Sequence, residues 1–209
     1  MMTRRFVISG TDTGVGKTVF AAGLAGALDG AYWKPIQSGF APEGDKETVI
    51  RLSGLPPDRI LPERYRLTAP LSPHRAAELD QIVIQPPELK LPDVDGPLVI
   101  EGAGGLMVPI TRAFLQIDLY RIWDVPVILV ARTTLGTINH SLLSISALRM
   151  QEIPIHGVAF VGEDNSDTIR TIGEMGEVRV LGRLPHLPQL NAGTLREAFM
   201  AHFREEDFA

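Results

Sequence analysis

The chemistry that this chain suggests most directly is phosphate binding, because residues 10–18 read GTDTGVGKT. A short apolar run at residues 6–8 precedes this glycine-rich segment, and a helix-like stretch at residues 19–28 follows it. In such a strand–loop–helix unit, backbone N–H groups and the positive end of the helix face an anion. Lys17 would add a positive charge, and the Thr18 hydroxyl would offer a ligand to Mg²⁺. The plain structural alternative is a turn that needs glycine only for its backbone conformation.

The loop is a variant of the usual phosphate-binding pattern. Thr11 stands where the common spacing has its first glycine, and Gly10 lies one residue earlier. The residues expected to bind the nucleotide lie at the end of the loop and the start of the helix: Gly14, Val15, Gly16, Lys17, Thr18 and Val19.

Glu101 directly follows another apolar run, residues 98–100. Ligands of α/β sheets bind beyond the carboxyl ends of the strands, and phosphate-loop proteins place there an acid that reaches Mg²⁺ directly or through water. Glu101 occupies this position, and the small residues Gly102, Ala103 and Gly104 let backbone approach a nucleotide closely. The alternative is a solvent-facing glutamate before a glycine turn.

A lysine and a pair of acids follow the short run at residues 31–33. Lys34, with the Ser38 hydroxyl four residues on, could bind an anionic intermediate or orient an amine, but a solvated surface lysine explains this segment equally well. Asp45 opens a helical stretch, either as a cap or as a second acid near the metal. Glu47 is the competing candidate for the metal.

A third polar segment follows the apolar run at residues 125–131. Gly136 and Thr137 stand at an expected helix start, where free N–H groups suit a carboxylate; an ordinary capped helix is the alternative. The histidines show no metal-ligand spacing, so we assign them structural or surface roles: His74, His140, His156, His186 and His202.

Length and composition limit the class of protein. The 209 residues suit one well-buried domain, and the 44% hydrophobic and 22% charged content excludes disordered and fibrous classes. The absence of cysteine excludes disulfides and thiol catalysis, and the net charge of −5 argues against nucleic-acid or anionic-membrane partners. No secretory leader and no bilayer-length apolar stretch is evident, so we expect a cytoplasmic protein.

Apolar runs alternate with helical patterns along the chain. Strands are expected at residues 6–9, 31–33, 98–100, 125–131, 156–161 and 178–181, and helices at 17–28, 47–52, 115–123, 138–150, 167–173 and 194–203. This alternation predicts an α/β fold with a doubly wound, mainly parallel sheet flanked by helices, of the P-loop NTPase type. Residues 53–97 are rich in proline, and we expect them to form an ordered excursion within a single domain spanning residues 1–209.

Five segments of the chain together resemble the dethiobiotin synthetase family. They are GTDTGVGKT at 10–18, KPIQSG at 34–39, SPH at 72–74, EGAGG at 101–105 and LGTINH at 135–140. The resemblance implies an ATP- and Mg²⁺-dependent ligase that forms the ureido ring of dethiobiotin from 7,8-diaminopelargonic acid and CO₂. The reaction would pass through a carbamate and its mixed anhydride with phosphate.

The resemblance also implies roles for individual residues. Three side chains would act on the carbamate and the transferring phosphoryl group: Thr13, Lys17 and Lys34. Three would surround Mg²⁺: Thr18, Asp45 and Glu101. Family members are homodimers, and a turn of the partner chain grips the substrate carboxylate. Ser38 would complete the substrate site together with the residues of that turn: Gly136, Thr137, Ile138 and Asn139.

The chain departs from the family at the nucleotide base. Family members often carry an asparagine that reads adenine where this chain has Val161. Base recognition would then fall to groups near Val161, Gly162, Pro185, His186 and Leu187.

Two other classes of protein compete with this interpretation. A partitioning or targeting P-loop switch ATPase would act on a macromolecular partner, but such proteins usually carry a signature lysine early in the loop, where Asp12 stands. An ATP-dependent amide ligase acting on a large ring carboxylate would normally add a glutamine-hydrolysing domain with a cysteine or triad. This chain has no cysteine and no room for that domain.

Overall fold

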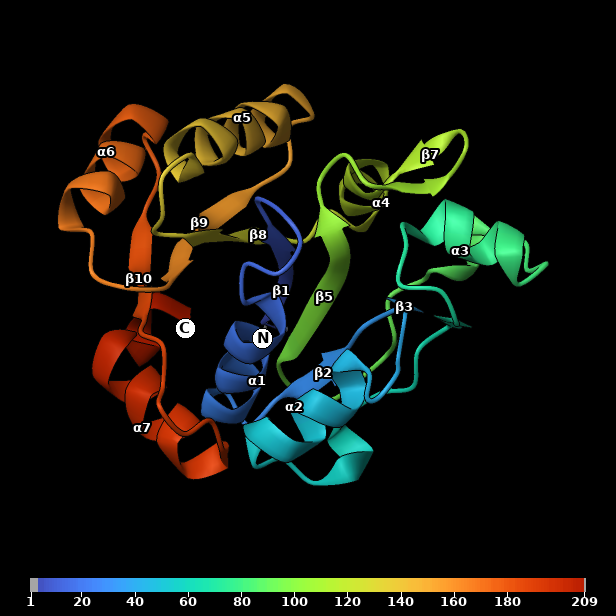
Figure 1. The fold of residues 1–209 in the computed structure, drawn as a ribbon, viewed down its shortest axis with the longest axis horizontal. Helices are drawn as coiled ribbons and strands as arrows, with labels where there is room; N and C mark the ends of the chain where they lie inside the picture. Colours follow the sequence, from blue (N-terminus) through green and yellow to red (C-terminus); the bar gives the residue numbers. More distant parts are fainter. Residues whose placement is uncertain (1–3, 209) are drawn as a thin grey trace.

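The central feature of the structure is a six-stranded sheet whose neighbouring strands all run parallel, in the order β10-β9-β8-β1-β5-β2 (Figure 1). The computed structural model describes residues 4–208. Residues 1–3, from the segment considered as a leader, and residue 209 lie outside the described residues. The sheet consists of β1 Arg5–Gly10, β2 Ala31–Trp33, β5 Leu98–Gly105, β8 Val127–Arg132, β9 Ile155–Val161 and β10 Val180–Leu184. The expected parallel α/β sheet is confirmed.

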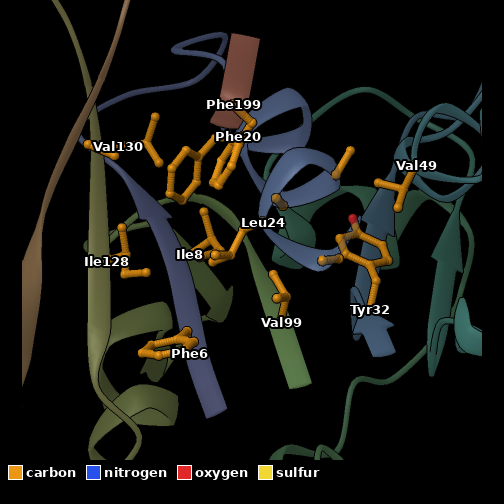
Figure 2. Close-up of a cluster of buried hydrophobic side chains, with 14 of the residues drawn as sticks. Phe6, Ile8, Phe20, Leu24, Tyr32, Val49, Val99, Ile128, Val130 and Phe199 are labelled. Atoms are coloured by element: carbon orange, nitrogen blue, oxygen red, sulfur yellow. The ribbon is translucent and has the colours of Figure 1, made fainter. Parts of the chain in front are cut away.

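Helices cover both faces of the sheet (Figure 1). One face is covered by α1 Lys17–Ala27, α2 Asp45–Ser53 and α7 Ala192–His202, and the other by α4 Gln116–Trp123, α5 Thr137–Met150 and α6 Ser166–Gly176. The side chains of β1 alternate between the two layers: Phe6 and Ile8 join the cluster under α1, whereas Val7 joins the opposite cluster. Figure 2 shows Phe20 and Leu24 of α1 against β1.

The proline-rich segment, residues 53–97, is built from short elements. It contains the 3₁₀ turns η1 Pro57–Arg59 and η2 Pro86–Glu88, strand β4 Tyr65–Leu67 and helix α3 Pro73–Leu79. Strand β4 pairs in parallel with β3 Ile36–Ser38, which follows the KP segment. Tyr65, Leu67 and Leu89 are buried in the cluster beneath α4. A second small sheet pairs β6 Pro109–Thr111 with β7 Phe114–Leu115, and η3 Glu205–Phe208 ends the described chain. None of these short strands is predicted by the sequence patterns.

The last strand differs from its expected range. The apolar run at residues 178–181 predicts a strand from Val178, but β10 begins at Val180 and extends to Leu184. The Val178 amide donates to the Gly173 carbonyl at 3.1 Å, so Val178 closes the end of α6 instead of entering the sheet. Among the helices of residues 4–208, none is long and apolar enough to cross a membrane.

Candidate active site

The loop between β1 and α1 has the conformation of a phosphate cradle. Gly14 and Gly16 have φ angles of 70° and 96°, in the left-handed region that favours glycine. The buried Val15 side chain anchors the loop between them in the core under α1. Lys17 is the first residue of α1, and its Nζ donates to the Asp12 carbonyl at 3.0 Å. Burial lowers the pKa of Lys17 despite the carboxylates around it.

Glu101 is the buried acid at the centre of the site, within β5. Its side chain is only 1% exposed, so the alternative of a solvent-facing glutamate does not hold. The Tyr32 hydroxyl donates to Oε2 at 2.8 Å, and the Thr18 hydroxyl and Lys34 Nζ both donate to Oε1 at 2.9 Å. Glu101 therefore joins β2, the phosphate loop and the segment after β2.

Lys34 lies between two carboxylates. Its Nζ contacts Asp45 Oδ2 as well as Glu101, and the residue is 6% exposed, so it is not a solvated surface lysine. Burial alone would lower the pKa of Lys34, but the charges of Glu101 and Asp45 outweigh it and raise the pKa above its ordinary value. The side chain is an ammonium ion at neutral pH.

The two competing acids of α2 have different surroundings. Burial tends to raise the pKa of Asp45, but Lys34 outweighs it and the pKa is lowered, so this carboxylate is ionised at neutral pH. Glu47 has other partners: its Oε2 accepts from the Gly44 amide at 2.9 Å and its Oε1 from Arg66 at 3.1 Å. Asp45 therefore lies in the cleft beside Lys34, whereas Glu47 acts as a helix cap.

These residues line one cleft with a volume of about 730 Å³, within the range of small-molecule sites. Twelve of the candidate residues line it: Thr13, Gly14, Gly16, Lys17, Thr18, Val19, Lys34, Ser38, Asp45, Glu101, Ala103 and Gly104. The Ser38 hydroxyl is buried and has no hydrogen-bond partner among the described residues. A ligand oxygen or nitrogen could therefore satisfy it.

Residues from the proline-rich segment complete the cleft, although no role is expected for them from the sequence. Pro70, Leu71, Ser72 and Pro73 line it together with the residues of the phosphate loop. The only signal for them was the SPH segment at residues 72–74. Gln37, from the unpredicted strand β3, supports the site: its Oε1 accepts from the Asp45 amide at 3.3 Å and its Nε2 donates to the Gly39 carbonyl at 2.7 Å.

Gly102 was expected to let a nucleotide approach, but in the structure it makes room for a tyrosine. A Cβ atom on Gly102 would lie 1.7 Å from the Tyr120 hydroxyl, which is buried beneath β5. Gly102 does not line the cleft, and neither does the buried Val15.

Gly102→Ala is expected to lower the free energy of unfolding by about 1–3 kcal/mol, because Tyr120 must move. Urea unfolding measures the loss. In a Tyr120→Phe background the same substitution should cost less, because the clashing oxygen is gone. An equal loss in both backgrounds would contradict this explanation.

The candidates for base recognition lie at the ends of β9 and β10. Val161, at the end of β9, packs on the loop: its Cγ1 would lie 2.8 Å from a Cβ atom on Gly16. Gly162 follows it, and the Gly162 carbonyl accepts from Arg183 at 2.8 Å. Three further candidates directly follow β10: Pro185, His186 and Leu187. None of these five residues lines the cleft.

The turn expected to hold a carboxylate also lies outside the cleft. Gly136 has a φ angle of 93° and caps the N-terminus of α5. Thr137 is buried and its hydroxyl donates to the Arg132 carbonyl at 2.8 Å, whereas Asn139 is exposed. Ile138 packs against the cluster between α5 and α6.

The residues expected to hold Mg²⁺ offer the oxygen atoms that this ion prefers. Thr18 supplies a hydroxyl, and Glu101 and Asp45 supply carboxylates that already share one cation, the Lys34 ammonium. Across residues 4–208 there is no cluster of three or more His, Asp or Glu side chains that would form an all-protein metal site. Two acids and a hydroxyl beside a phosphate cradle fit an ion that keeps positions for phosphate oxygens and water.

Comparisons with known structures show the fold. The cell division ATPase MinD of Pyrococcus furiosus has a TM-score of 0.56 and 16% identity, covering 96% of this chain and 88% of that one. MinD of Aquifex aeolicus has a TM-score of 0.51 and 15% identity, covering 93% of this chain and 87% of that one. Both are P-loop ATPases of the type expected, and the likeness at this identity extends to the fold alone.

Comparisons with known sequences show the family. A family model described as an AAA domain matches residues 4–194. The ATP-dependent dethiobiotin synthetase of Rhodopseudomonas palustris strain HaA2 is 58% identical over 99% of this chain and 97% of that protein. That of Rhizorhabdus wittichii is 59% identical over 100% of both. The enzyme of Agrobacterium fabrum is 56% identical over 99% of this chain and 98% of that protein. The chain therefore belongs to the matched AAA-domain family and to the family of ATP-dependent dethiobiotin synthetases.

Proposed function

We propose that this protein closes the ureido ring of dethiobiotin, using 7,8-diaminopelargonic acid, CO₂ and ATP and releasing ADP and phosphate. The observation that carries the proposal is the position of Lys34. This ammonium ion is buried between Asp45 and Glu101, in the cleft that also contains Lys17 of the phosphate loop. A cation beside a phosphate cradle suits a reaction in which an anionic oxygen attacks a phosphoryl group.

The reaction begins with carbamate formation. One amine nitrogen of the substrate attacks the carbon of CO₂ and loses a proton, which leaves an anionic carbamate. The raised pKa of Lys34 keeps its ammonium charged beside that anion. The unpartnered Ser38 hydroxyl and the Thr13 hydroxyl would donate hydrogen bonds to it. These groups lower the energy of the carbamate by charge and orientation.

Phosphoryl transfer follows within the same cleft. A carbamate oxygen forms a bond to the γ-phosphorus of ATP, and the bond from that phosphorus to ADP breaks. Lys17 and the loop N–H groups at residues 14–18 would neutralise the oxygens of the transferring group. Thr18, Asp45 and Glu101 would hold Mg²⁺, which when bound supplies further positive charge to the phosphate oxygens.

Ring closure completes the reaction. The second amine nitrogen attacks the carbonyl carbon of the mixed anhydride and loses a proton. The bond between that carbon and the phosphate oxygen breaks, and phosphate leaves. No group of the protein forms a covalent bond to the substrate, so positioning and charge stabilisation account for the catalysis.

The substrate carboxylate would be held by the turn at residues 136–139 of a second protomer. This turn does not line the cleft of its own chain. Leu135, Leu143 and Met150, on or next to α5, are 106%, 61% and 79% exposed, and apolar side chains of this kind favour contact with another chain. We therefore propose a homodimer in which each turn serves the cleft of the partner protomer.

The nucleotide base would lie near the ends of β9 and β10. Val161 packs on the phosphate loop at Gly16, so a base extending from the bound phosphates would pass this side chain. Because Val161 offers no hydrogen-bonding group, base contacts would come from the backbone of Gly162 and of residues 185–187.

The experiment that tests this function measures phosphate release from MgATP and bicarbonate, with and without diaminopelargonic acid. We expect release that requires the diamine, together with a cyclic urea product identified by mass spectrometry. Release that ignores the diamine but is stimulated by DNA or lipid would overturn the proposal and favour a switch ATPase.

A further inference from the structure

The outer half of the phosphate loop, residues 11–14, has little packing to hold its shape. Asp12, Thr13 and Gly14 are exposed, whereas Val15 and Lys17 are buried. A Cβ atom on Gly14 would meet no atom within 4 Å. This half of the loop nevertheless carries Thr13 and Gly14 into the cleft, so hydrogen bonds must fix its position.

One side chain from outside the loop supplies such bonds. Arg132, the last residue of β8, donates from one guanidinium nitrogen to Asp12 Oδ2 at 2.9 Å and to the Thr13 carbonyl at 3.2 Å. The other carboxylate oxygen of Asp12 accepts from the Thr13 amide at 2.7 Å. Within residues 4–208, no other side chain from outside residues 10–18 donates a hydrogen bond to Asp12 or Thr13.

Arg132 also connects the loop to α5. Its backbone carbonyl accepts from the Thr137 hydroxyl at 2.8 Å, at the first turn of the helix. Asp12 and Arg132 are 51% and 43% exposed, so this ion pair contributes little to global stability. Its effect should be local, on the position of the loop.

We propose that Arg132 is a positioning residue for phosphoryl transfer, acting through Asp12 and the Thr13 carbonyl. By holding the outer half of the loop, it sets the place of Thr13 and the Gly14 amide relative to the γ-phosphoryl group. Small displacements of positioning groups can reduce a rate by about 100-fold. The inference rests on the proposed function, because it assigns the loop a part in phosphoryl transfer.

The test compares Arg132→Ala, Asp12→Ala and the double variant with the parent protein. We expect kcat/KM for MgATP to fall by about 10- to 100-fold in each single variant, with the melting temperature nearly unchanged. The double variant should lose less than the sum of the two single losses, because both substitutions remove the shared contact between Arg132 and Asp12. Arg132→Lys, which keeps the charge and a single donor nitrogen, should be intermediate.

A second readout does not depend on turnover. Hydrogen exchange at the amides of Thr13 and Gly14 should speed up in Arg132→Ala, with no change in the helix cores. Arg170→Ala is the matched control, because Arg170 also forms an exposed ion pair with an aspartate, Asp167, but on α6. It should alter neither the exchange of the loop nor the kinetics.

Several results would overturn the inference. These are unchanged kinetics and exchange in Arg132→Ala, additive losses in the double variant, or a loss in Arg132→Ala that Asp12→Ala does not share. Failure of the proposed function is recognised separately, because the parent protein itself would then release no phosphate in response to the diamine.

Discussion

Lys34→Ala is expected to lower turnover strongly while MgATP binding persists. In the proposed reaction the Lys34 ammonium neutralises the carbamate and the mixed anhydride, and removing a group that stabilises developing charge lowers kcat by about 100- to 1,000-fold. ATP binding depends instead on Lys17 and the N–H groups of the phosphate loop. Removing Lys34 also leaves Asp45 and Glu101 without their shared cation, which favours binding of a divalent metal at these two carboxylates.

Diamine-dependent phosphate release measures the loss of turnover in the Lys34 variant. Equilibrium titration with a non-hydrolysable MgATP analogue measures whether nucleotide binding persists. Lys34→Met is the matched variant, because it keeps most of the volume of the side chain and removes the charge together with its N–H donors. Circular dichroism and the melting temperature show whether each variant is folded. Full turnover in a folded Lys34 variant would remove this residue from the chemistry.

Asp45→Asn and Glu47→Gln are expected to behave very differently, although the two residues lie two positions apart at the start of α2. Asp45 shares Lys34 with Glu101 and lines the cleft, so its loss should lower diamine-dependent phosphate release by about 100-fold and raise the Mg²⁺ concentration needed. Glu47 contacts the Gly44 amide and Arg66, so its loss should leave turnover within about 2-fold and cost about 1 kcal/mol of stability.

Titration of activity against Mg²⁺, combined with urea unfolding, separates the two effects. If both variants lose the same activity and need the same Mg²⁺ concentration, or if Glu47→Gln loses more activity, the assignment of Asp45 to the metal is wrong. Both carboxylates are ionised at neutral pH because their pKa values lie below the ordinary range, so the comparison is free of protonation differences.

The features predicted from the sequence are those carried by contiguous residues. The loop at residues 10–18 combines a strand, left-handed glycines and a helix start, and each of these has a local signal. The parallel strands were predicted because they are buried on both faces and appear as continuous apolar runs. Val178 shows the limit of that signal, since an apolar residue can close a helix as well as enter a strand.

The features that could not be predicted depend on contacts between distant segments. Tyr32 binds Glu101 across 69 positions of sequence, and no local pattern indicates this pair. The small residue Gly102 suggested a ligand, whereas its neighbour in the fold is Tyr120. Asp45 and Glu47 are both acids of a first helical turn, and only the position of Lys34 distinguishes them.

Asp12 stands at the loop position where the switch-ATPase alternative predicts a lysine. Here the residue is a carboxylate paired with Arg132 of the same chain. The charge at this point of the loop is therefore balanced within this chain.

The most direct test of the proposed reaction is the origin of the oxygen atoms in the released phosphate. The protein would be mixed with MgATP, diaminopelargonic acid and freshly dissolved C¹⁸O₂, and the products analysed by mass spectrometry before the label exchanges with water. Carbamate phosphorylation predicts one labelled oxygen in phosphate and one in the ureido carbonyl for each turnover. Unlabelled phosphate that takes its new oxygen from H₂¹⁸O in the converse experiment would show hydrolysis of ATP by water and contradict the account.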